Sequence, residues 1–139
     1  MRTITVALIL TLLTACRSRS PRPVDIEPSD MCGFCRMAIS QKRFAAEVLD
    51  ADENAVKFDD IGCMLRYLEG GRPKPAAVFV MDYETREWKH ANAASFVRGS
   101  KVATPMGGGI LAFGEKARAE SAVRDLGGEA LPFERLSKP

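Results

Sequence analysis

The sequence predicts an α+β fold of small antiparallel sheets partly covered by helices. Two observations carry this prediction. Short β-prone runs occur in pairs separated by turn residues, and apolar residues at helical spacing follow them. A chain of 139 residues with 46% hydrophobic residues is long enough for one folded domain. The formal net charge is only +2, and the absence of a basic block excludes nucleic acid as an expected partner.

The first half of the folded region predicts a hairpin followed by a helix. Residues 44–48 and 55–58 are β-prone, and the polar segment 50–54 between them is turn-like. Asp59 or Asp60 can cap the helix, because an aspartate side chain accepts hydrogen bonds from the free amides of a first turn. A glycine pair at 70–71 ends it. The apolar positions at helical spacing are Ile61, Met64, Leu65 and Leu68.

The same order of elements recurs in the second half. Residues 77–82 suit a strand, 83–86 a turn, 87–90 a returning strand, and 92–97 a short helix capped by Asn92. The prediction is therefore two small ββα units. Beyond them, residues 110–113 suit a strand and 115–126 a helix closed by glycines 127 and 128. The expected inward residues of that helix are Ala117, Ala122, Val123 and Leu126.

The first 15 residues predict a secretion signal. Arg2 precedes an apolar run at 4–13, which is shorter than the roughly 20 residues that a membrane span needs. Leu13-Thr14-Ala15-Cys16 resembles a bacterial lipobox, which predicts fatty acyl chains such as palmitate on Cys16 and a mature protein tethered to a membrane. An ordinary signal peptide with a chance cysteine is the alternative. Proline-rich residues 16–30 predict a disordered, flexible tether, so the folded domain is expected at 31–139.

If Cys16 carries lipid, Cys32, Cys35 and Cys63 remain in the domain. Three cysteines cannot all pair within one chain, and a leftover thiol in an oxidising compartment most often serves a metal site. Cys63 stands near a predicted helix start, where free amides favour the thiolate and lower the pKa. It could equally be a small buried hydrophobic residue.

Methionines accompany these cysteines. Met31 and Met37 flank the C-x-x-C segment, Met64 follows Cys63, and Met106 lies in a glycine-rich turn. Thiolates combined with thioethers are soft donors that select Cu(I). Each of these methionines could instead fill a gap in the core, and Met81, inside a strand-like run, is assigned to the core.

Two other uses of the cysteines stay open. The three cysteines and His90, the only histidine, could hold a structural zinc ion, although the end of a strand also suits His90 as a surface residue. Cys32 and Cys35 could form a thiol–disulfide exchange pair that keeps a copper site reduced. The sequence contains neither a catalytic triad pattern nor a phosphate-binding loop, so an enzyme is not expected.

The chain resembles the NosL family, the lipoprotein accessory proteins of nitrous oxide reductase. Beside the lipobox, the matching segments include Cys32 to Met37, the run 43–47 (RFAAE), 58–64 (FDDIGCM) and 104–109 (TPMGGG). Many members have Cys-Gly-Met where this chain has Cys35-Arg36-Met37, so either Cys32 or Cys35 could be the principal ligand.

The resemblance implies a Cu(I)-binding chaperone on the periplasmic side of a bacterial membrane, on a fold of two ββα units. Its copper would go to nitrous oxide reductase or its maturation complex. The metal-binding residues that the resemblance implies are Cys32, Cys35, Met37, Cys63, Met64 and Met106. His90 remains a further possible ligand.

Overall fold

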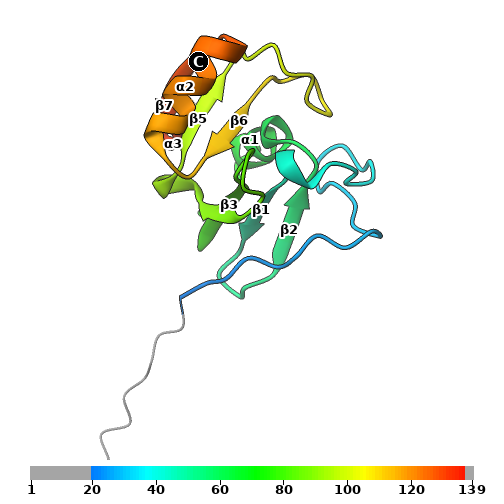
Figure 1. Cartoon of the computed structure of the whole chain (residues 1–139). Helices are drawn as coiled ribbons and strands as arrows, with labels where there is room; N and C mark the ends of the chain where they lie inside the picture. Colours follow the sequence, from blue (N-terminus) through cyan, green and yellow to red (C-terminus); the bar gives the residue numbers. More distant parts are fainter. Residues whose placement is uncertain (1–19, 137–139) are drawn as a thin grey trace, which may run out of the picture.

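The computed structural model describes residues 20–136 (Figure 1). The predicted signal peptide and Cys16 lie outside these residues. Within 20–136, each helix is too short or too polar to cross a membrane. The elements in chain order are η1 (Lys42–Phe44), β1 (Ala46–Leu49), β2 (Ala55–Phe58), α1 (Ile61–Glu69), β3 (Ala77–Met81), β4 (Trp88–His90), η2 (Ala91–Ala93), β5 (Ser95–Arg98), β6 (Leu111–Phe113), α2 (Lys116–Leu126), β7 (Glu129–Pro132) and α3 (Phe133–Leu136).

The first sheet has four antiparallel strands in the order β2-β1-β3-β4. Its register places Val48 of β1 between Val56 of β2 and Val78 of β3. Helix α1 packs against β1 and β2. Val48 of β1 and Val80 of β3 point to the same face of the sheet and join the apolar side of α1 in one core cluster. Both predicted hairpins therefore contribute to a single sheet.

The second sheet has three antiparallel strands in the order β6-β5-β7 and is covered by α2 and α3. Figure 1 shows it stacked beyond the first sheet, with α2 on its outer side. The central strand β5 is buried on both faces. Phe96 points into the core cluster of α1, and Val97 points into the cluster beneath α2. The second sheet thus separates the two cores.

The α+β class with antiparallel sheets is confirmed, but the predicted helix at 92–97 is wrong. Residues Ala91–Ala93 form one 3-10 turn, and Ser95–Arg98 form β5. A strand forms here because adjacent residues of a strand point to opposite faces, so that Phe96 and Val97 are buried in two different cores. The second ββα unit is consequently β5, β6 and α2.

Two smaller differences concern where elements begin. The first strand begins at Ala46, because Lys42–Phe44 form a 3-10 turn that buries Phe44. Helix α2 begins at Lys116, so Ala117 lies in an exposed first turn, contrary to the prediction, and Ala119 is buried instead. The inward side of α2 is Ala119, Ala122, Val123 and Leu126. Strand β7 and helix α3 were not anticipated.

The packed chain begins before Met31, in a segment that we call the strap (residues 24–30). The backbone N–H of Val24 donates to the Glu47 carboxylate at 2.9 Å, and Ile26 is buried against the sheet. Lys57 Nζ donates to the Asp25 carbonyl and to the Asp30 carboxylate, each at 2.6 Å. Figure 1 shows this segment in blue beside β1 and β2. The strap covers the face of the first sheet that α1 leaves free.

Candidate metal centre

Two of the three cysteines lie on a tight loop before the first sheet. The Cys32 N–H donates to the Met37 carbonyl at 2.8 Å, and the Arg36 N–H donates to the Cys32 carbonyl at 3.0 Å. The Gly33 N–H donates to the Lys57 carbonyl at 2.8 Å, which fixes the loop on β2. A Cβ at Gly33 would collide with the Val56 side chain, so the close approach requires glycine.

The third cysteine lies in the first turn of α1, whose start is set by Asp60. The Asp60 Oδ1 atom accepts a hydrogen bond from the Gly62 N–H at 2.6 Å, as an N-cap residue does. Its Oδ2 atom accepts from the Met106 N–H at 3.2 Å. Asp60 therefore fixes both the helix start that carries Cys63 and the glycine-rich turn that carries Met106.

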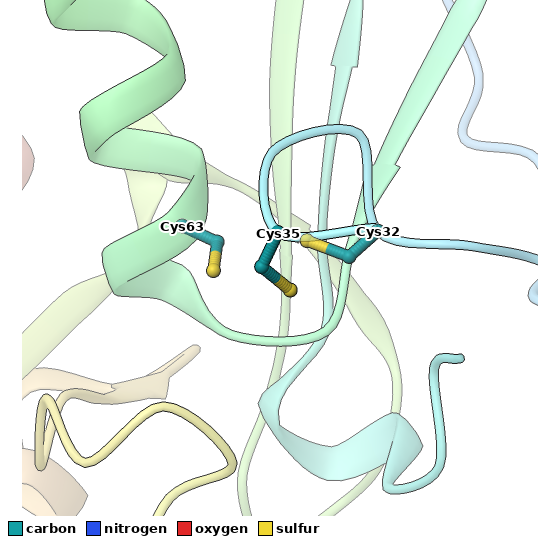
Figure 2. A group of neighbouring side chains, drawn as sticks. All are labelled: Cys32, Cys35 and Cys63. Carbon is teal, nitrogen blue, oxygen red and sulfur yellow. The ribbon is translucent and has the colours of Figure 1, made fainter. Parts of the chain in front are cut away.

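The three thiols meet at one point (Figure 2). Every pair among the Sγ atoms of Cys32, Cys35 and Cys63 lies within 4.8 Å, and all three are free thiols. Cys32 and Cys63 are fully buried, whereas Cys35 is half-buried. Small side-chain rotations can bring all three sulfurs onto one metal ion, and Cys35 is the partly exposed member of the three.

The electrostatics of the thiols differ from the sequence expectation, which placed the thiolate at Cys63. Burial raises the pKa of Cys32, but hydrogen bonds from the backbone amides of Asp59, Cys35 and Phe34 outweigh burial and lower it overall. Burial and the charge of neighbouring Cys32 raise the pKa of Cys63. The predicted benefit of the helix start is therefore exceeded by burial, and of Cys32 and Cys63 it is Cys32 that ionises more readily.

The candidate methionines occupy different positions around the thiols. Met64 is fully buried in the core cluster that contains Cys32 and Cys63. Met106 is half-buried and packs against the same cluster. Met37, in contrast, is 58% exposed on the outer side of the loop. Met81 is buried under the strap with Ile26, away from this cluster, as its assignment to the core requires.

His90 is not grouped with the three thiols. It is exposed at the end of β4, with its ring centroid 4.3 Å from that of Phe79. It borders a cavity of about 770 Å³ next to Arg72 and Phe133. The zinc site that would combine His90 with the cysteines is therefore not assembled in this structure.

Two features of the site escaped sequence reasoning. The aspartate pair indicated a helix cap, but nothing in the sequence revealed that Asp60 also holds the Met106 turn, 46 positions away. The Asp59 amide beside Cys32 was also missed, because contacts between distant segments leave no local pattern. The Thr104-Pro105-Met106-Gly107 segment was the available signal for the turn, which the hydrogen bond from the Gly107 N–H to the Thr104 carbonyl closes at 2.9 Å.

Comparison with known proteins agrees with this architecture. The crystal structure of the copper chaperone NosL from Shewanella denitrificans superposes with a TM-score of 0.77 at 22% identity, covering 85% of this chain and 97% of that one. No curated protein matches the chain. The model of the NosL family matches residues 23–139, which include the strap from its first residue onward. The chain belongs to the NosL family.

Proposed function

We propose that this protein is a copper chaperone that carries Cu(I) on Cys32, Cys35 and Cys63. The observation that carries the proposal is the meeting of three free thiols within 4.8 Å, partly sealed from solvent. The structurally similar NosL of Shewanella denitrificans is itself described as a copper chaperone. Family membership supports delivery to nitrous oxide reductase or its maturation complex as the recipient.

The donor set suits a monovalent copper cargo. Thiolates are soft ligands that prefer Cu(I), and the cluster contains neither an imidazole nor a carboxylate that would favour harder ions. A site with two or three sulfurs also leaves room for an incoming ligand, because Cu(I) accepts another donor before the old one leaves. The half-buried Cys35 is the position where that exchange begins.

Thioethers complete the proposed donor set. Met106 is the best placed, since Asp60 holds its backbone and its side chain packs against the cluster of Cys32 and Cys63. Met64 reaches the same core from α1. Met37 remains a candidate that contacts the ion only as copper enters or leaves, because it is 58% exposed.

Delivery outside the cytoplasm is part of the proposal. The lipobox-like Leu13-Thr14-Ala15-Cys16 supports a lipid anchor on Cys16 at the periplasmic side of a bacterial membrane. Mass spectrometry of the membrane fraction tests the anchor: an acylated amino-terminal Cys16 is expected, and an unmodified chain cut elsewhere would refute it.

The decisive experiment is an anaerobic competition between the reduced protein and a chromophoric Cu(I) chelator. One Cu(I) per chain is expected. Replacing Cys63 by Ser should weaken Cu(I) binding about a hundredfold or more, because a soft thiolate becomes a poor alcohol ligand. Ala119→Ser, which also places a serine at a buried position but within α2, should leave the affinity unchanged. Retained affinity in Cys63→Ser would remove Cys63 from the site.

A second candidate is thiol–disulfide exchange by Cys32 and Cys35. The favouring observation is that backbone amides lower the pKa of Cys32, as in thiols that attack disulfides, while Cys35 is near and half-buried. Equilibration with glutathione buffers tests it. A reversible Cys32–Cys35 disulfide in a protein that retains no Cu(I) would replace the chaperone by this reductant.

A further inference from the structure

The loop that carries Cys32 and Cys35 also carries most of the exposed large hydrophobic side chains among residues 20–136. Among residues 20–136, the exposed large hydrophobic side chains are those of Val24, Met31, Phe34 and Met37. Three of the four lie within seven consecutive residues around the thiols. Exposed apolar side chains gathered in one place mark an interaction surface, whereas scattered ones do not.

The charge around these side chains is mainly positive, and Asp30, the acidic residue directly before Met31, is paired with Lys57 Nζ at 2.6 Å. Segments 31–41, 61–68 and 101–113, which supply the three thiols and Met106, contain no aspartate or glutamate. The nearby Asp59 and Asp60 are buried and bonded to backbone amides. Arg36 and Arg66 are exposed, and the Arg66 guanidinium stands 5.4 Å from the ring centroid of Phe34.

We propose that these side chains form the docking surface for a copper-exchanging protein that presents acidic residues around its own sulfur ligands. The surface, called here the sulfur rim, consists of Met31, Phe34, Arg36, Met37 and Arg66. The apolar members supply contact area, and the two arginines select an acidic partner and speed its approach. This inference rests on the proposed copper function, because it adds the partner class for the same site.

Copper transfer at this surface is a ligand exchange without a redox step. A thiol of the partner forms a bond to Cu(I) as its proton leaves to solvent, and the bond from Cu(I) to one protein sulfur breaks. The released thiolate takes up a proton, so copper stays monovalent and the charges balance. The sulfur rim affects how often the two sites meet, whereas the three cysteines determine how tightly the ion is held.

The test uses two synthetic peptides with the same Cys-x-x-Cys motif, one flanked by aspartates and the other by lysines. Transfer of Cu(I) from the copper-loaded protein to each peptide is followed by stopped flow. The aspartate peptide should take copper about tenfold faster at low ionic strength, since electrostatic steering changes association rates by at least that much. The difference should shrink as salt is added.

Charge reversal supplies the matched comparison. Arg36→Glu combined with Arg66→Glu should invert the preference between the peptides. Arg124→Glu combined with Arg135→Glu, on α2 and α3, changes the net charge equally and should leave the preference intact. Equal rates for both peptides in the unmodified protein, or equal effects of the two double variants, would overturn the proposal.

A second measurement stands apart from copper binding. Titration of the reduced, metal-free protein with a cysteine-free aspartate peptide that carries leucines should shift the amide NMR signals of Phe34 and Arg66. Phe34→Ser should weaken this association several-fold. Absence of binding there would refute the docking surface even in a protein that holds Cu(I). Peptide binding by a protein that fails to take up Cu(I) in the chelator competition would keep the surface and refute the chaperone function.

Discussion

The two ββα units of the molecule have the same order of elements but different junctions between strand and helix. In the first unit, Asp60 caps α1 with its own side chain, and Cys63 follows within one turn. In the second unit, Glu115 precedes α2 without a side-chain cap. The junction there is held from outside, because the Asp82 carboxylate in the β3–β4 turn accepts a hydrogen bond from the Gly114 N–H at 2.6 Å.

The difference shows that the candidate site depends on the residues at the junction between strand and helix, and not on the ββα order of elements. A self-capped helix start places a thiol and a second hydrogen-bonding oxygen at a fixed point, so that a distant turn can dock there. A junction held by a neighbouring hairpin stabilises the packing of the two sheets, and residues 114–118 carry no sulfur. Three experiments test this contrast.

The largest expected effect comes from the two caps. Asp60→Ala should lower the free energy of unfolding by about 2 to 3 kcal/mol, because it removes the cap and leaves the part-buried amides of Gly62 and Met106 without their partner. Glu115→Ala should change it by no more than about 0.5 kcal/mol, since the side chain caps nothing. Urea unfolding measures both. Equal losses of unfolding free energy in the two variants would mean that the Asp60 cap gives the first junction no special stability.

A smaller effect is expected for the methionine that the first junction holds. Met106→Leu conserves volume but removes the thioether, so Cu(I) affinity should fall about tenfold, or about 1.4 kcal/mol, with stability nearly unchanged. Met81→Leu provides the control, because Met81 lies under the strap. Competition with a Cu(I) chelator compares them, and unchanged affinity in Met106→Leu would exclude its sulfur from the site.

The smallest effect concerns the second junction and depends on pH. Burial raises the pKa of Asp82, but hydrogen bonds from the amides of Thr85, Gly114 and Glu84 outweigh it, so the pKa is lowered. A lowered carboxyl pKa contributes stability above the unfolded-state value near 4, and the contribution is lost as the pH falls. Asp82→Asn should therefore cost about 1 kcal/mol at pH 7 and progressively less below pH 4. A pH-independent loss, measured by thermal unfolding, would contradict the ionic role.

The sequence predicts those elements whose composition or spacing is distinctive. The β-prone runs at 55–58 and 77–82 and the helix after the aspartate cap are confirmed as β2, β3 and α1. The segment 92–97 could not be assigned correctly, because Phe96 and Val97 are both buried, one in each core. A strand buried on both faces has the same local pattern as a short helix, and only the tertiary structure separates them.

The candidate site divides along the same line. Residue type and spacing indicated Cys32, Cys35 and Cys63 as candidate soft donors, and the structure brings their sulfurs together. That they bind copper stays a prediction. The sequence could not establish the direction of the Cys32 pKa shift, since burial raises this pKa and amides that include that of Asp59, from a distant segment, outweigh burial. Nor could it exclude His90 from the cluster, because the end of β4 is placed by strand pairing.

The strap has a mechanical consequence. A force applied to the chain upstream of Val24 reaches the domain first at the Val24–Glu47 hydrogen bond and at the Lys57 contacts with Asp25 and Asp30. Glu47 and Lys57 are paired with each other across β1 and β2, so the load passes into the hydrogen-bonded ladder of these two strands. The cysteine loop begins only after this anchorage. Tension on the amino terminus would therefore be absorbed before it could spread the three sulfurs apart.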